Sequence, residues 1–213
     1  MPAESAPFAH LDEKALRALA PSGTMRPYPR NVVVVSEGDP TDSLYVVVTG
    51  RVKAFVTDEN GKELVLGTIE AGDFFGELVL DGGARAASIM TLESSRFFVI
   101  PQRDAEALLT RNPEFARVLV RKLIGKVRSL TERVRDLALK DVYGRLVRFL
   151  DEQAEDQDGR RVVRERLTQA DIAARIGGSR EMVSRILSDL AAGGYLAVES
   201  KRIVLHRKLP SHW

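Results

Sequence analysis

The chain has 213 residues, of which 44% are hydrophobic, and this is enough for two small domains with packed cores. It contains no cysteine, which excludes disulfides, iron–sulfur clusters and thiolate zinc sites. It has no apolar run of the roughly 18 residues that a membrane span needs and no secretory signal at its N-terminus, so we expect no membrane partner and a cytoplasmic location.

The net charge of +2 conceals an uneven distribution. Residues 1–112 carry 11 Lys and Arg against 16 Asp and Glu, whereas residues 160–213 carry 11 against 5. A basic C-terminal part indicates contact with a polyanion such as nucleic acid. A solvated basic surface without a partner is the plainer alternative.

The first half of the chain predicts a short helix followed by many strands. Residues 11–20 have amphipathic spacing, and Pro21-Ser22-Gly23 ends the pattern. From Tyr28 to Ile100, runs of β-branched and aromatic residues alternate with turn residues, which is typical of a small antiparallel barrel or sandwich. Within it, Asn60-Gly61 predicts a two-residue hairpin turn.

After Pro101 the pattern becomes helical. Residues 102–110 predict a short helix, and Asn112-Pro113 opens a long one that we expect to reach Lys140. Its apolar residues are spaced alternately by three and four, as in a coiled-coil seam, and they are Val120, Leu123, Val127, Leu130, Val134 and Leu137. So narrow a stripe favours pairing with the same helix of a second copy, and packing on the chain's own domain is the alternative.

Residues 141–154 predict a further helix, and the polar stretch 155–161 predicts a loop. The remaining segment predicts two helices separated by the turn Gly177-Gly178-Ser179, followed by two short strands near residues 196–198 and 203–205. Thr168 is expected to cap the first of these helices, with Asp171 in its first turn. The expected inner face of that helix consists of Ala170, Ile172, Ala173 and Ile176.

The second helix, which Ser179 is expected to cap, has an outer face suited to DNA. Val183, Ile186, Leu187 and Leu190 form its apolar stripe, which leaves Arg180, Glu181, Ser184, Arg185 and Ser188 outside. Arginine can bond guanine O6 and N7, and glutamate can accept from cytosine N4. Thr168, Gln169 and Ser179 can donate to phosphates. The alternative for the charged residues is a ladder of surface ion pairs.

These residues resemble the recognition segment of the CRP/FNR family of bacterial regulators, whose Ser-Arg-Glu-x-x-x-Arg signature stands here as Ser179, Arg180, Glu181 and Arg185. GDPTDSLYVVVTGRVKAF and GDFFGELVLDGGARAAS are similar to the family's N-terminal half, so the resemblance covers about residues 10–207. It implies an α+β fold with three parts, which are a cyclic-nucleotide-binding β-roll at 1–112, a long dimerisation helix at 113–140 and a winged helix-turn-helix at 141–213. It also implies a homodimer that binds palindromic DNA with TGTGA-like half-sites one helical turn apart and contacts RNA polymerase.

The same resemblance implies an effector pocket. Its phosphate cassette is similar to Gly76, Glu77, Leu78, Arg85, Ala86 and Ala87. Glu77 could accept a ribose 2′-OH, and Arg85 could pair with a cyclic phosphate. However, Glu77 and Arg85 stand eight residues apart, one or two fewer than in the common cassette. The family's adenine-contacting Thr-Ser pair aligns with Leu130 and Thr131, of which only Thr131 can hydrogen-bond a base.

Three interpretations of the pocket therefore stay open: it binds cyclic AMP or cyclic GMP, it binds another effector such as cyclic di-GMP, or it binds nothing. For the whole chain, the leading hypothesis is a DNA-binding regulator, and the alternative is a cyclic-nucleotide-binding module that controls a protein partner. The sequence contains no nucleophile–base set and no P-loop, and His10, His206 and His212 are scattered, so we expect no enzyme activity, no metal and no covalent cofactor.

Overall fold

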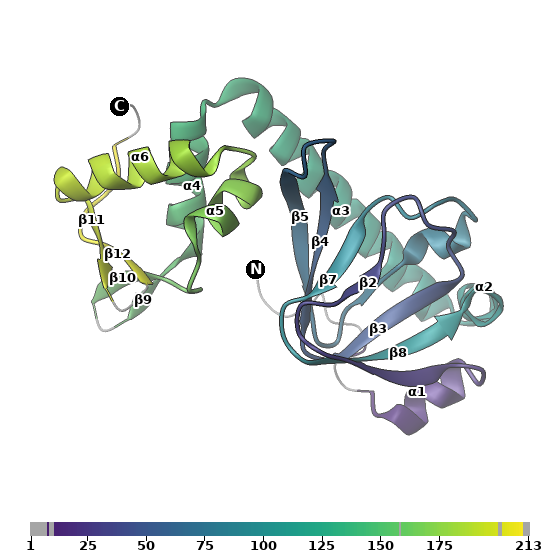
Figure 1. Cartoon of the computed structure of the whole chain (residues 1–213). Helices are drawn as coiled ribbons and strands as arrows, with labels where there is room; N and C mark the ends of the chain where they lie inside the picture. The colour runs from purple at the N-terminus through teal and green to yellow at the C-terminus, as the bar shows by residue number, and fades with distance from the viewer. Residues whose placement is uncertain (1–7, 9–10, 158, 200–201, 211–213) are drawn as a thin grey trace. The chain divides into compact units, whose positions relative to one another are not determined.

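The computed structural model describes residue 8 and residues 11–157, 159–199 and 202–210. Packing divides the chain into two compact units, Met1–Val127 and Arg128–Trp213, and the boundary between them lies within the longest helix. Each unit has its own hydrophobic core and combines helices with antiparallel strands (Figure 1). The expected α+β fold is confirmed.

The first unit is mainly β-structure with helices packed on one side of it. Its elements in chain order are α1 (Glu13–Leu19), β1 (Thr24–Tyr28), β2 (Val33–Val35), β3 (Ser43–Thr49), β4 (Arg51–Thr57), β5 (Glu63–Glu70), β6 (Phe74–Phe75), the 3₁₀ turn η1 (Glu77–Leu80), β7 (Ser88–Thr91), β8 (Ser95–Pro101), α2 (Gln102–Arg111) and the first part of α3 (Pro113–Leu139). The strands form two antiparallel sheets in the orders β1-β8-β3-β6 and β2-β7-β4-β5.

Side-chain alternation along β3 and β8 builds two cores at once. Because successive side chains of a strand point to opposite faces, Tyr45 and Val47 enter the core shared with Val52 and Ile89 of the second sheet. Their neighbours enter the other core, which faces the helices and contains Leu44, Val46, Phe98, Ile100, Leu16, Leu108 and Phe115. The first sheet is thus covered on both faces, which is why its central strands are almost wholly apolar.

The hairpin predicted at Asn60-Gly61 is present, but its turn differs from the prediction. Strands β4 and β5 pair from Thr57 and Glu63 onward, so the loop has five residues. A two-residue type I′ turn needs positive φ at both central residues, and Gly61 has φ 77° whereas Asn60 does not lie in that region. The Asp58 carboxylate instead accepts from the backbone N–H of Asn60 and Lys62, which organises the longer loop.

The second unit contains the end of α3 and a four-stranded sheet packed on three helices. Its further elements are α4 (Val142–Gln153), β9 (Ala154–Gln157), β10 (Arg160–Val163), α5 (Gln169–Ile176), α6 (Arg180–Ala192), β11 (Leu196–Glu199) and β12 (Arg202–Leu205). The sheet order is β11-β12-β10-β9, with every pairing antiparallel. Two predictions for this unit are wrong. Within the predicted loop, residues 155–157 and 160–161 lie in the paired strands β9 and β10, and Ala170 is exposed rather than part of the inner face of α5.

Candidate functional site

Local sequence determines where the two helices of the helix-turn-helix begin and end. Thr168 and Asp171 form a reciprocal capping box at the start of α5, and Gly177 ends that helix in the left-handed conformation with φ 68°. The Ser179 hydroxyl accepts from the backbone N–H of Met182 and so caps α6. The predicted caps at Thr168 and Ser179 and the predicted helix end at Gly177 are confirmed.

The first two turns of α6 present a polar surface without internal partners. Arg180, Glu181 and Arg185 are exposed, and Ser184 is half-buried. In the described part of the chain, the side chains of this trio make no hydrogen bond or ion pair with one another or with other residues. The alternative ladder of surface ion pairs is therefore not formed. Opposite them, Val183, Leu187 and Leu190 are buried in the core of the unit and fix which face of α6 points outward.

The two other predicted phosphate contacts, Thr168 and Gln169, lie at the start of α5 and differ in whether their side chains already take part in the helix cap. The Thr168 hydroxyl donates to the Asp171 carboxylate at 2.6 Å and accepts from the Asp171 N–H at 3.1 Å, so it already serves the helix cap. Gln169 is the first residue of the helix and is half-buried. Of the two side chains, only that of Thr168 takes part in the cap of α5.

In the first unit, the shortened cassette still brings Arg85 beside Gly76. Gly76 has φ 87°, and a Cβ atom there would lie 2.7 Å from Nη1 of Arg85 and 2.8 Å from the carbonyl oxygen of Ser43. Only glycine therefore fits this position. The backbone of Arg85 is anchored on both sides, because its N–H donates to the carbonyl of Asp39 and its carbonyl accepts from Gly38.

The Arg85 guanidinium is buried and only partly satisfied. Its side chain is 4% exposed, and Nη2 donates to the carbonyl of Ser43 at 3.0 Å and to the exposed Asp42 carboxylate at 3.3 Å. Within the described chain, Nε and Nη1 have no hydrogen-bond partner. Buried donors without a partner are costly and rare, so the two nitrogens indicate a place for an anion.

Glu77 is held by a residue that sequence reasoning missed. Its carboxylate pairs with Nζ of Lys126 on α3 at 2.7 Å, and its side chain is 9% exposed. Burial alone would raise the pKa of Glu77, but the Lys126 ammonium outweighs burial and holds that pKa below its ordinary value. One turn earlier, Lys122 reaches the Asp73 carboxylate and the carbonyl of Phe74. No local pattern marks these lysines, because their partners are about 50 residues away in the sequence.

The remaining residues predicted to bind the effector differ in their exposure. Leu78 lies in η1 and is half-buried, Ala86 is exposed, and Ala87 is half-buried just before β7. Thr131 belongs to the second unit and is exposed on α3, so its approach to the pocket stays a prediction.

The apolar seam of α3 is uncovered in the single chain. Its exposed fractions run from 40% at Leu123 to 65% at Val134. The full seam is Val120, Leu123, Val127, Leu130, Val134 and Leu137, and the structure adds Ile124 at 48% exposed. Large apolar side chains gathered on one helix face indicate a partner surface.

Two features are absent from the described residues. No helix among them is both long and apolar enough to cross a membrane. No group of three or more His, Cys, Asp or Glu side chains among them is placed to hold a metal ion.

Comparisons with known proteins match both units. Residues 25–112 match the cyclic nucleotide-binding domain family, and residues 144–208 match the Crp-like helix-turn-helix domain family. A "CRP-like cAMP-activated global transcriptional regulator" of Mycobacterium tuberculosis is 30% identical over 203 residues, which cover 93% of this chain and 91% of the relative. The "cAMP-activated global transcriptional regulator CRP" of Salmonella typhimurium is 29% identical, over 84% of this chain and 88% of that one.

Among solved structures, that of the c-di-GMP responsive global regulator CLP of Xanthomonas campestris has a TM-score of 0.80 and 27% identity, covering 90% of this chain and 97% of that chain. These relatives are regulators and not enzymes. With a cyclic nucleotide-binding domain before a Crp-like helix-turn-helix domain, and with similarity over nearly its whole length, this chain belongs to the CRP/FNR family of transcription regulators.

Proposed function

We propose that this chain acts as a homodimer that binds a palindromic DNA site through α6 and is controlled by a cyclic nucleotide in its first unit. The observation that carries the proposal is the exposed trio Arg180, Glu181 and Arg185, whose side chains make no hydrogen bond or ion pair within the described chain. Three charged side chains on the first two turns of a helix, backed by a buried stripe, fit the major groove.

In this proposal each member of the trio has a distinct role. Arg180 and Arg185 bond the O6 and N7 atoms of guanines, and Glu181 accepts from the N4 amino group of a cytosine. Ser184 lies beside them, and Ser179 and Gln169 donate to phosphates at the helix starts, joined by Thr168 if its cap rearranges. Half-sites of the TGTGA type contain the guanines, and their complementary strand the cytosines, that such contacts require.

The two α6 helices are brought to successive grooves by pairing of the α3 seams. The seam side chains are 40–65% exposed in the single chain, and burying them against a second copy is favourable at about 25 cal/mol per Å² of apolar surface. A dimer also supplies the two-fold symmetry that a palindromic site needs. Contact of the bound dimer with RNA polymerase follows from family membership and is part of the proposal.

For the effector, the support comes from Arg85. The cyclic phosphate would accept from Nε and Nη1, the two buried donors that lack a partner. The Glu77 carboxylate, ionised because Lys126 lowers its pKa, would accept from a ribose 2′-OH. Amides near Leu78 and Ala86 would complete the phosphate site, Ala87 would border it, and Thr131 would face the base. The relatives named as cAMP-activated and the structure named as c-di-GMP responsive define the ligands to compare.

Two measurements test the proposal. In a gel shift with a TGTGA-type palindrome, Arg180→Ala should weaken binding by about 1–3 kcal/mol and relax specificity at one base position. An equal loss on every sequence would mean that Arg180 contacts phosphate only. Calorimetric titration with cyclic AMP, cyclic GMP and cyclic di-GMP, with and without DNA, identifies the effector. If none of the three binds, the effector part of the proposal is wrong.

A further inference from the structure

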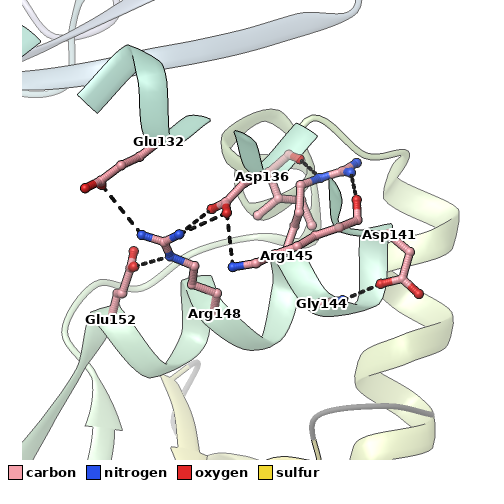
Figure 2. Close-up of polar contacts among 9 residues, drawn as sticks. Glu132, Asp136, Asp141, Gly144, Arg145, Arg148 and Glu152 are labelled. Atoms are coloured by element: carbon pink, nitrogen blue, oxygen red, sulfur yellow. Dashed lines mark hydrogen bonds and ion pairs between the residues drawn. The ribbon is translucent and has the colours of Figure 1, made fainter. Parts of the chain in front are cut away.

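The Arg85 guanidinium has fewer acceptors than the two arginines that join α3, α4 and α5. Nη1 of Arg148 donates to both carboxylate oxygens of Asp136, at 2.9 and 2.8 Å, and its Nε donates to Glu152 at 2.6 Å (Figure 2). Arg145 donates to three backbone carbonyls, which are those of Lys140, Ile176 and Gly177. Both guanidinium groups are matched by acceptors of their own unit, so neither indicates a ligand.

Arg85, in contrast, has a single carboxylate beside it, and that carboxylate is exposed. Oδ1 of Asp42 lies 3.3 Å from Nη2, and the Asp42 side chain is 81% exposed whereas that of Arg85 is 4% exposed. The shorter bond of Nη2 goes to the Ser43 carbonyl at 3.0 Å, and Nε and Nη1 have no partner in the described chain. Asp42 therefore leaves most of the donors of Arg85 unused but places a negative charge at their edge.

Backbone contacts of the shortened cassette fix the position of Asp42. A β-bridge joins Pro40 to Ala84, and the Thr41 hydroxyl donates to the Gly83 carbonyl at 2.5 Å. Asp42 follows directly after these contacts. Because the two segments are joined at neighbouring residues, the Asp42 carboxylate stays close to the guanidinium even when its side chain makes no bond to Nη2.

The remaining ion pairs of this corner of the first unit add no excess positive charge. Glu77 pairs with Lys126 at 2.7 Å, and Asp73 pairs with Lys122 at 2.5 Å. Together with the pair of Asp42 and Arg85, the corner contains as many carboxylates as cations. A ligand that brings one negative charge leaves a net charge of −1 there, and every further negative charge adds to that excess.

We propose that Asp42 is a specificity-determining residue of the effector site, and that its charge favours ligands that bring one negative charge to Arg85 over ligands that bring two. A cyclic phosphodiester carries one charge. A phosphomonoester, whose second pKa is about 6, carries two at pH 8. The inference rests on the proposed function in one respect, which is that Arg85 binds the phosphate.

The distance between the charges sets the size of the effect. A phosphate bonded to Nε or Nη1 would lie about 7 Å from the Asp42 carboxylate, because the hydrogen bond on each side of the guanidinium is about 3 Å long. At this distance, repulsion between two unit charges changes affinity by about threefold in water and by about fiftyfold at a protein surface. Since the Asp42 side chain is mostly exposed, we expect about threefold to tenfold.

The test compares nucleotides that differ by one charge. Calorimetric titration of the full chain at pH 8 gives the Kd of cyclic AMP and cyclic GMP, and competition gives that of 5′-AMP and 5′-GMP. The discrimination is the ratio of the Kd of the monophosphate to that of the cyclic nucleotide with the same base. Asp42→Asn should lower this ratio by about threefold to tenfold, and Asp42→Glu should retain it. The control is Glu59→Gln, which removes an exposed negative charge of the β4–β5 loop and should leave the ratio unchanged.

Two readouts separate this role from a structural one. If Asp42 only holds Arg85 in place, Asp42→Asn should weaken both nucleotides of a pair by the same factor, so that the ratio stays constant. If its charge acts on the ligand, the effect of Asp42→Asn on the ratio should shrink between about 0.1 M and about 1 M salt, because the Debye length falls from about 10 to about 3 Å.

A ratio that Asp42→Asn leaves unchanged would overturn the proposal, and nucleotide binding in the same titrations would still support the proposed function. If the wild-type chain binds none of the four nucleotides, the proposed control by a cyclic nucleotide is wrong. In that case the inference requires that Asp42→Asn binds a monophosphate, and failure to do so would overturn the inference as well.

Discussion

Replacing Arg85 by methionine should stabilise the free protein and abolish its response to the effector. The side chain is 4% exposed, and Nε and Nη1 lack partners within the described chain. Each unpaired buried polar group costs about 1–3 kcal/mol, so relief of two gives about 2–6 kcal/mol. The loss of the Nη2 bond to the Ser43 carbonyl, at 3.0 Å, and of the contact with the Tyr45 ring offsets about 2–4 kcal/mol of this.

The midpoints of these two ranges, about 4 and about 3 kcal/mol, leave a net gain of about 1 kcal/mol in the free energy of unfolding. A gain of that size raises the Tm by about 2–8 °C for domains of roughly 100–200 residues. Thermal scans with and without cyclic AMP, cyclic GMP or cyclic di-GMP measure both effects. The ligand that binds should raise the Tm of the wild-type protein, because a ligand at about 100 times its Kd stabilises by about 2.7 kcal/mol. It should have no effect on Arg85→Met.

The matched control is Arg96→Met, at an exposed arginine of the same unit. It should leave both the Tm and the ligand response near those of the wild-type protein. The reasoning is refuted if Arg85→Met lowers the Tm of the free protein and the ligand-induced rise persists. Arg85 would then be a structural residue whose contacts to Ser43 and Asp42 outweigh its burial.

Three further predictions concern α3. Val134→Glu places like charges opposite each other in the seam and should convert the dimer into a monomer, as measured by sedimentation at micromolar concentration. Arg135→Glu, beside the seam, is the control and should leave the dimer intact. A dimer that persists in Val134→Glu would exclude the seam as the interface. Gly125→Ala should raise the free energy of unfolding by about 1 kcal/mol in urea titrations, and a loss of stability would mean that a partner atom occupies the open space. For Asp136, burial opposes ionisation, but Lys140 and Arg148 hold the pKa below its ordinary value of about 3.9. The ionised Asp136 carboxylate therefore stabilises the folded protein above pH about 4, and this contribution is lost as the pH falls through the pKa of Asp136 in the folded state. Asp136→Asn should thus have a lower free energy of unfolding than the wild-type protein at neutral pH. In acid the two proteins should be equally stable. A difference independent of pH would show that the charge of Asp136 is not what holds Arg148.

The helix-turn-helix was predictable because its signals are local. Thr168, Asp171, Gly177 and Ser179 define helix ends through contacts that reach no further than four residues along the chain. The spacing of Val183, Leu187 and Leu190 then decides which face of α6 is buried. Exposure of Arg180, Glu181 and Arg185 follows from helical periodicity alone.

The β9–β10 hairpin was not predictable in the same way. Residues 155–161 are polar and charged, with low intrinsic preference for strands. Residues 160–161 nevertheless lie in a strand, because β10 pairs with β12, about 40 residues later, through Arg161 with Leu205 and Val162 with Val204. Residues 155–157 in turn pair with β10. Pairing at that distance overrides the local preference of the segment.

Local sequence therefore accounts for most elements outside β9 and β10, for the helix ends, for the outward face of α6 and for the seam of α3, because each depends on neighbours within a turn or a strand. Only the tertiary structure placed Arg85 beside Gly76 with two donors unsatisfied, joined Lys126 to Glu77, and fastened α3 to α4 and α5 through Arg148 and Arg145. Those contacts join residues between 5 and 49 positions apart, and burial decides their strength. The distance between two such atoms in the folded chain cannot be read from a local sequence pattern.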